Sequence, residues 1–240
     1  MTDRDGEPRF GRTAAVVIGY AIAMAYVESA VVVDLQTALN AQVGVLFPLK
    51  PIDQTNGLIA IEAGREAATL VMIAAVGLLA GRSSLERLAW SAVVFGVWDI
   101  GYYGWLFVFS GWPPSLGTLD LLFLLPVPWV GPVWSPMAVS AALVVVGLIA
   151  AAAVRRGRRL TVARRHVAAG LGGGLLVILS YTLDSGRLVD GGLPGPYPWP
   201  VFVAGLLLAL AAAADALGPG RSPGYSASSG SESDATSPGR

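Results

Sequence analysis

The chain has no cysteine, a single histidine and little charge. Without cysteine it has no disulfide, no thiolate metal site and no cysteine nucleophile, and His166 alone cannot form a histidine metal site. Only 13% of the 240 residues are charged, against about 25% in a soluble domain. The formal net charge is zero, which argues against nucleic acid as a partner. We therefore name no metal ligands, and no motif identifies a cofactor.

The chain is rich in apolar residues, since 54% of its residues are hydrophobic. A helix needs about 20 apolar residues to cross a bilayer, and six runs are long enough or nearly so. The sequence therefore predicts an all-α polytopic membrane helix bundle in contact with lipid. The first run is too long for a signal-peptide core and contains Glu28, so we interpret it as an uncleaved helix. The six predicted spans are approximately 13–33, 57–80, 88–109, 133–154, 166–183 and 199–217.

The segment 112–134, between the third and fourth runs, is rich in proline and tryptophan. Pro126 and Pro128 prevent a continuous helix, so this segment is too irregular to cross the membrane. Tryptophan is typical of the membrane–water interface. Irregular backbone at membrane depth is tolerated only against protein or water. We predict a short re-entrant or interfacial segment that packs on the bundle at its outer side.

The basic residues predict the topology. Thirteen of the 16 Lys and Arg residues fall in the two tails and in the second and fourth connections, whereas only Lys50 and Arg187 lie in the other connections. By the positive-inside rule both termini lie in the cytoplasm, and the protein lies in the cytoplasmic membrane. Residues 1–12 then form a cytoplasmic N-terminal tail. Residues 218–240, rich in Gly, Ser and Pro, are predicted to be a disordered cytoplasmic tail.

The second run, 57–80, is unusual because it carries Glu62, Arg65 and Glu66. Each charge at the centre of a membrane helix costs roughly 2.5–3.5 kcal/mol on insertion scales. The spacings i, i+3 and i+4 place the three side chains on one helix face, which must therefore meet protein rather than lipid. We expect Arg65 to be held by Glu62, or by Glu28 or Asp99 from a neighbouring helix.

Other spans place polar residues at a similar depth. Counting 1.5 Å per residue from the span centres puts the acids of the first two spans in the outer half of the membrane. Asp99 of the third span lies about at the midplane with two tyrosines beyond it, and Ser180 and Tyr181 of the fifth span lie in the same outer half. The four carboxyls of these spans face a single internal cation, and low dielectric favours protonation or a bound cation over that charge excess. The candidate ligand- or ion-binding residues are Glu28, Glu62, Arg65, Glu66, Asp99, Tyr102 and Tyr103.

The fifth run contains a GxxxG pattern formed by Gly170 and Gly174. Small residues at this spacing allow two membrane helices to approach closely. These two glycines therefore permit a close helix–helix contact.

The strings AYVESAVVV, EAGREAATLVM and FGVWDIGYYGWLFVFSGWPPSLGTLDLLFLLPVPWVGPV lie within residues 15–145. Together they resemble a group of uncharacterised bacterial multi-pass membrane proteins. The resemblance implies a multi-pass fold in a bacterial inner membrane and brings no function with it.

Three functions stay open. The polar layer can bind a proton, a cation or a small solute for transport or binding, or it can belong to an intramembrane enzyme that acts on a lipid or isoprenoid. In the enzyme, Asp99 or Glu66 would be the general acid, with Tyr102 or Tyr103 orienting the substrate. The third possibility is a structural network in a subunit of a membrane complex. The sequence identifies no catalytic residue, oligomeric state or partner subunit.

Overall fold

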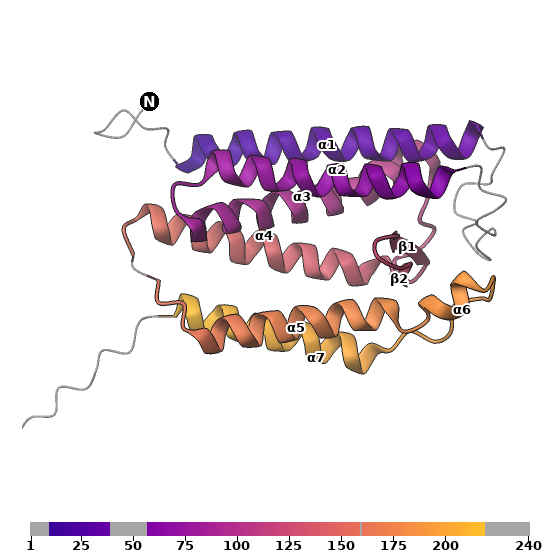
Figure 1. The fold of residues 1–240 in the computed structure, drawn as a ribbon. Coiled ribbons are helices and arrows are strands. Elements are labelled where there is room, and N and C mark those ends of the chain that lie inside the picture. Colours follow the sequence, from indigo (N-terminus) through magenta and orange to yellow (C-terminus); the bar gives the residue numbers. More distant parts are fainter. Residues whose placement is uncertain (1–9, 39–56, 159, 219–240) are drawn as a thin grey trace, which may run out of the picture.

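A computed structural model describes residues 10–38, 57–158 and 160–218. Six helices within these ranges are long and apolar enough to cross a membrane, which confirms the predicted all-α polytopic bundle. The chain is thus an integral membrane protein. The predicted tails lie almost wholly outside the described residues. The six helices are α1 (Phe10–Ala38), α2 (Leu58–Ala80), α3 (Ser84–Ser110), α4 (Trp134–Arg155), α5 (Arg164–Thr182) and α7 (Trp199–Leu217) (Figure 1).

The connection between α3 and α4 forms an antiparallel hairpin of β1 (Leu119–Phe123) and β2 (Trp129–Pro132). Pro126 and Pro128 lie in the turn between the strands, where neither residue interrupts the strand pairing. The sequence predicted an irregular segment here but not the strands. The α5–α7 connection contains one further short helix, α6 (Ser185–Val189).

The helices form two groups. In the first group, α3 packs on α1, α2 and α4. In the second, α5 and α7 pack closely on each other, and much less extensively on α4 and β2 (Figure 1). The hairpin lies at one end of the bundle, beside the last turns of α5. This division leaves room for a cavity between the groups.

A buried ion pair joins four helices at the end of the bundle opposite the hairpin. Nε of Arg155 lies 2.5 Å from Oε1 of Glu86, whose side chain is 1% exposed. Glu86 also accepts a hydrogen bond from the indole N–H of Trp90. Arg155 donates to Thr13 in α1 and to the carbonyl of Ala80 in α2. Burial of this pair was not anticipated, because the sequence indicated Arg155 only as a topology determinant and placed Glu86 outside the third span.

The contact between α5 and α7 depends on two glycines that approach each other's backbone. A Cβ on Gly173 would lie 2.6 Å from the carbonyl oxygen of Gly205, and a Cβ on Gly205 would lie 2.7 Å from that of Gly173. The close approach that Gly170 and Gly174 permit does not occur, since a Cβ at either position would meet nothing within 4 Å. The physical reason is helix rotation: at 3.6 residues per turn, residues 170 and 174 are turned by about 60° and about 100° from residue 173, and so lie beside the line of contact with α7.

We therefore expect Gly173→Ala to destabilise the protein, because the added methyl group forces α5 away from α7. Overpacking of this kind costs about 1–3 kcal/mol. The matched control is Gly170→Ala on the same helix, which should be neutral because its Cβ meets open space. Thermal unfolding in detergent measures both. Equal melting temperatures for the two variants would contradict the assigned contact.

Candidate functional site

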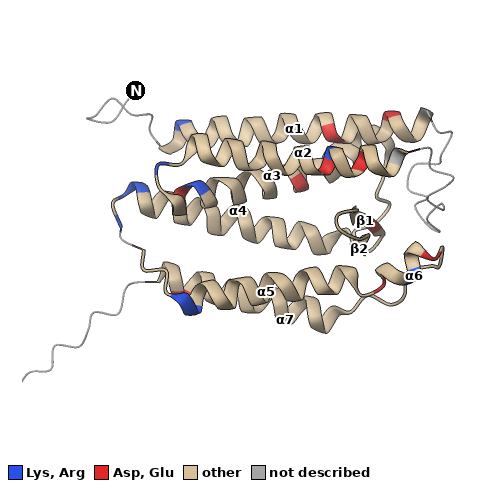
Figure 2. Cartoon of the chain, viewed as in Figure 1, with Lys and Arg blue, Asp and Glu red and all other residues tan. Residues whose placement is uncertain are grey.

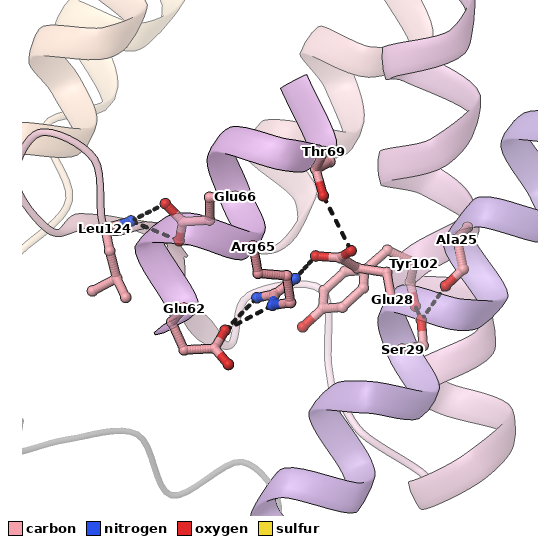
Figure 3. A network of polar contacts seen from close by, with 9 residues as sticks. All are labelled: Ala25, Glu28, Ser29, Glu62, Arg65, Glu66, Thr69, Tyr102 and Leu124. Carbon is pink, nitrogen blue, oxygen red and sulfur yellow. Dashed lines mark hydrogen bonds and ion pairs between the residues drawn. The ribbon is translucent and has the colours of Figure 1, made fainter. Parts of the chain in front are cut away.

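Arg65 in α2 binds carboxylates from two helices (Figure 3). Its Nε and Nη2 lie 2.8 Å and 2.6 Å from Oε2 of Glu62, one turn earlier on the same helix. Its Nη1 forms an ion pair with Glu28 of α1. Two of the three expected partners are thus confirmed. The third, Asp99, is not a partner: its carboxylate instead accepts a hydrogen bond from Ser140 of α4 at 2.8 Å.

The residues beside Glu28 fix the position of α1. Ser29 is fully buried and donates to the carbonyl oxygen of Tyr102 in α3 at 2.9 Å. Thr69 of α2 contacts the Glu28 carboxylate at 3.3 Å. Three helices therefore hold the Glu28 carboxylate beside Arg65, and this fixed geometry favours an ion pair in low dielectric.

Glu66, the next residue in α2, points toward the hairpin (Figure 3). Its carboxylate accepts hydrogen bonds from the backbone N–H of Leu124, at 2.9 Å and 3.0 Å to the two oxygens, and from that of Leu125 at 3.3 Å. These amides follow β1, beyond the last strand pair, and would otherwise lack a backbone acceptor. Glu66 thus ties α2 to the hairpin.

Asp120 of β1 is a buried carboxylate that the sequence did not single out. Tyr103 of α3 donates its hydroxyl to Oδ2 of Asp120 at 2.8 Å, and the backbone N–H of Leu121 donates to Oδ1. Burial raises the pKa of Asp120 to about 7, with a smaller contribution from Asp99, although the Tyr103 hydrogen bond opposes this shift. The available signal was a single acid within the apolar run 119–125, beside the prolines.

A cavity of about 510 Å³ lies between the two groups of helices. Its polar residues gather at the hairpin end, and Glu62 is outside the lining although it binds Arg65. The predicted layer is therefore largely brought together, and the structure adds Thr69 and Asp120. The polar lining residues include Glu28, Arg65, Glu66, Thr69, Asp99, Tyr102, Tyr103, Asp120 and Tyr181.

Away from the hairpin the cavity is apolar. Its walls there come from α4, α5 and α7. The two glycines of the GxxxG pattern belong to this wall, so their lack of side chains widens the cavity and does not bring helices together. The apolar lining includes Leu143, Val146, Gly170, Gly174, Leu206 and Leu210.

Two tryptophans in the cavity wall have buried indole N–H groups. Nε1 of Trp98 and Nε1 of Trp129 have no acceptor within the described part of the chain. A buried donor without an acceptor costs about 1–3 kcal/mol. The aromatic faces of the same side chains attract cations.

The charges of the lining are unbalanced. Glu28, Glu66, Asp99 and Asp120 provide four carboxyls, whereas Arg65 is the one basic side chain among the described lining residues. Arg65 already contacts two carboxylates, so it has little capacity for an added anion. The described residues contain no group of three or more His, Asp and Glu side chains placed to hold a metal ion. Chemically, the site can accept protons or a positively charged group.

Comparison with known proteins gives no match to a family model, to a curated protein or to a solved structure. This agrees with the resemblance of the sequence to a group without a characterised function.

The Arg65 network leads to a prediction about stability. Arg65→Leu leaves Glu28 and Glu62 without their cation, and removal of one partner of a buried pair costs about 3–5 kcal/mol. The double variant Arg65→Leu/Glu28→Leu should recover much of this loss, because the more deeply buried carboxylate is removed with the arginine. Thermal unfolding in detergent compares the variants. Unchanged stability for Arg65→Leu would show that the pairs contribute nothing to the fold.

Asp120 leads to a prediction about pH. Its folded pKa of about 7 lies above the usual value of 3.8, so the folded state retains the proton over this interval and the unfolded state does not. Its contribution to stability is complete below the usual pKa and is lost as the pH rises to about 7. Asp120→Asn should therefore reduce the difference in melting temperature between about pH 5 and about pH 8. An identical difference in both proteins would refute the assignment.

Proposed function

We propose that this protein binds a positively charged solute in the cavity, as a binding or transport protein of the cytoplasmic membrane. The observation that supports this proposal is the excess of carboxyls in the lining. Four carboxyls face one arginine in a low-dielectric environment, and a bound cation would balance their charge without protonation of every acid.

An anionic solute fits this site poorly. Arg65 is the one basic residue among the described lining residues, and Glu28 and Glu62 already contact its guanidinium group. A phosphate or carboxylate entering the cavity would also meet Glu66, Asp99 and Asp120 at close range. Like charges repel most strongly where water is excluded. The same argument disfavours an isoprenoid phosphate as a substrate.

The proposed orientation places the polar end of the cavity toward the outside of the cell. In Figure 2 the basic residues of the described chain gather mainly at the end where α4 finishes and α5 begins, opposite the hairpin. The positive-inside rule assigns that end to the cytoplasm. A solute would then reach the carboxyls from the outer side, past the hairpin.

Asp120 would couple cation binding to the release of a proton. A carboxyl with a pKa of about 7 exchanges its proton at physiological pH, and a cation held nearby would favour the ionised form. Cation uptake would therefore be accompanied by release of a proton from Asp120. The same pKa favours a second candidate function, an intramembrane enzyme in which Asp120 acts as general acid. An enzyme would convert bilayer lipids into new species detectable by mass spectrometry, whereas a binding protein would leave them unchanged.

Calorimetric titration of the detergent-purified protein with butylammonium tests the proposal. Asp99→Asn keeps an acceptor for Ser140 but removes a negative charge from the lining, and it should weaken binding at least tenfold. Asp215→Asn is the matched control. It makes the same chemical change in a side chain that is 58% exposed, near the end of α7. Equal affinities in the two variants would refute the proposal, as would the failure of both butylammonium and its longer homologue octylammonium to bind the unaltered protein.

A further inference from the structure

The cavity extends well beyond its charged end. On α5, its lining residues Gly170, Gly174 and Ile178 are spaced four residues apart and form one line along the helix. This line is about 12 Å long at 1.5 Å per residue. On α4, the lining runs from Pro136 to Val146, or about 15 Å. A small inorganic cation held by the carboxyls would leave this apolar length unused.

We propose that the ligand is a cationic amphiphile: an ammonium group bound at the carboxyls, carried on an apolar chain that lies between α4, α5 and α7. This inference rests on the proposed function and narrows it to a class of molecule. The cavity volume of about 510 Å³ is within the usual range for sites that enclose organic ligands, roughly 300–1,000 Å³. The ligand lies along the helices, with its charge toward the hairpin.

Two further observations agree with this class of ligand. Gly170 and Gly174 remove side chains from α5 at the middle of the apolar wall, and Gly173 on the adjacent face makes the contact with α7. At the polar end, Trp98 and Trp129 line the cavity, and their aromatic faces attract an ammonium group.

The test compares butylammonium with octylammonium by calorimetric titration in maltoside micelles. Titration into empty micelles gives the partitioning of each probe, which is subtracted. The longer chain adds methylene groups that gain free energy only where an apolar wall receives them. We expect octylammonium to bind at least tenfold more tightly than butylammonium. Octyl sulfate has the same chain and the opposite charge, and we expect no measurable binding.

Gly174→Leu places a side chain in the apolar part of the cavity, where its Cβ meets nothing within 4 Å. It should weaken octylammonium binding at least tenfold and leave butylammonium binding unchanged. Gly170→Leu provides the same test if the first variant is unstable. The matched control is Gly104→Leu, which adds the same side chain at an exposed position of α3 outside the lining and should change neither affinity.

The outcomes separate the inference from the proposed function. If neither ammonium probe binds, the proposed function fails. If both bind with equal affinity, or if Gly174→Leu weakens both equally, cation binding stands and the amphiphile is refuted. Binding of octyl sulfate as tight as that of octylammonium would also refute it, because the cavity would then select only the chain.

Discussion

The structure depends on the need to partner every charge that α2 brings into the membrane. Arg65 and Glu66 are adjacent in sequence and point to different elements: Arg65 to Glu28 of α1, and Glu66 to the backbone of the hairpin turn. In lipid neither side chain would have a partner, and the cost would be several kcal/mol for each. The two contacts therefore fix α2 between α1 and the hairpin. The residues that make them line one wall of the cavity.

Two polar clusters at opposite ends of the bundle differ in how completely they are satisfied. Glu86 and Arg155 form a buried ion pair in which the charges cancel, and Arg155 also contacts α1 and α2 while Glu86 accepts from Trp90 of its own helix. This network has the properties of a structural brace. The cluster near the hairpin has more acids than bases and faces a cavity, and two indole donors there lack acceptors. The contrast within one molecule supports a binding role for the second cluster.

The glycines of α5 have two roles: one allows close packing against α7, and two others border the cavity. Gly173 allows the backbone of α7 to approach, while Gly170 and Gly174, turned away from that line of contact, leave space in the cavity. Close contact between α5 and α7 makes them a unit that packs lightly on the remaining helices. The cavity lies at this weaker boundary. A ligand held there would contact both groups of helices and would strengthen their association.

The sequence by itself determined the number of membrane helices and most of the polar residues at the cavity. Long apolar runs have few structural solutions in a bilayer, and a charge within such a run must face protein. Only the tertiary structure decided which groups meet. Asp99 contacts Ser140 and not Arg65, because helix rotation and the crossing of α3 with α4 set its direction. Asp120 and the hairpin were missed because a short strand has no distinctive periodicity, and the use of Gly173 instead of Gly170 depends on the position of α7. Such choices depend on packing between distant segments, which local sequence patterns do not record.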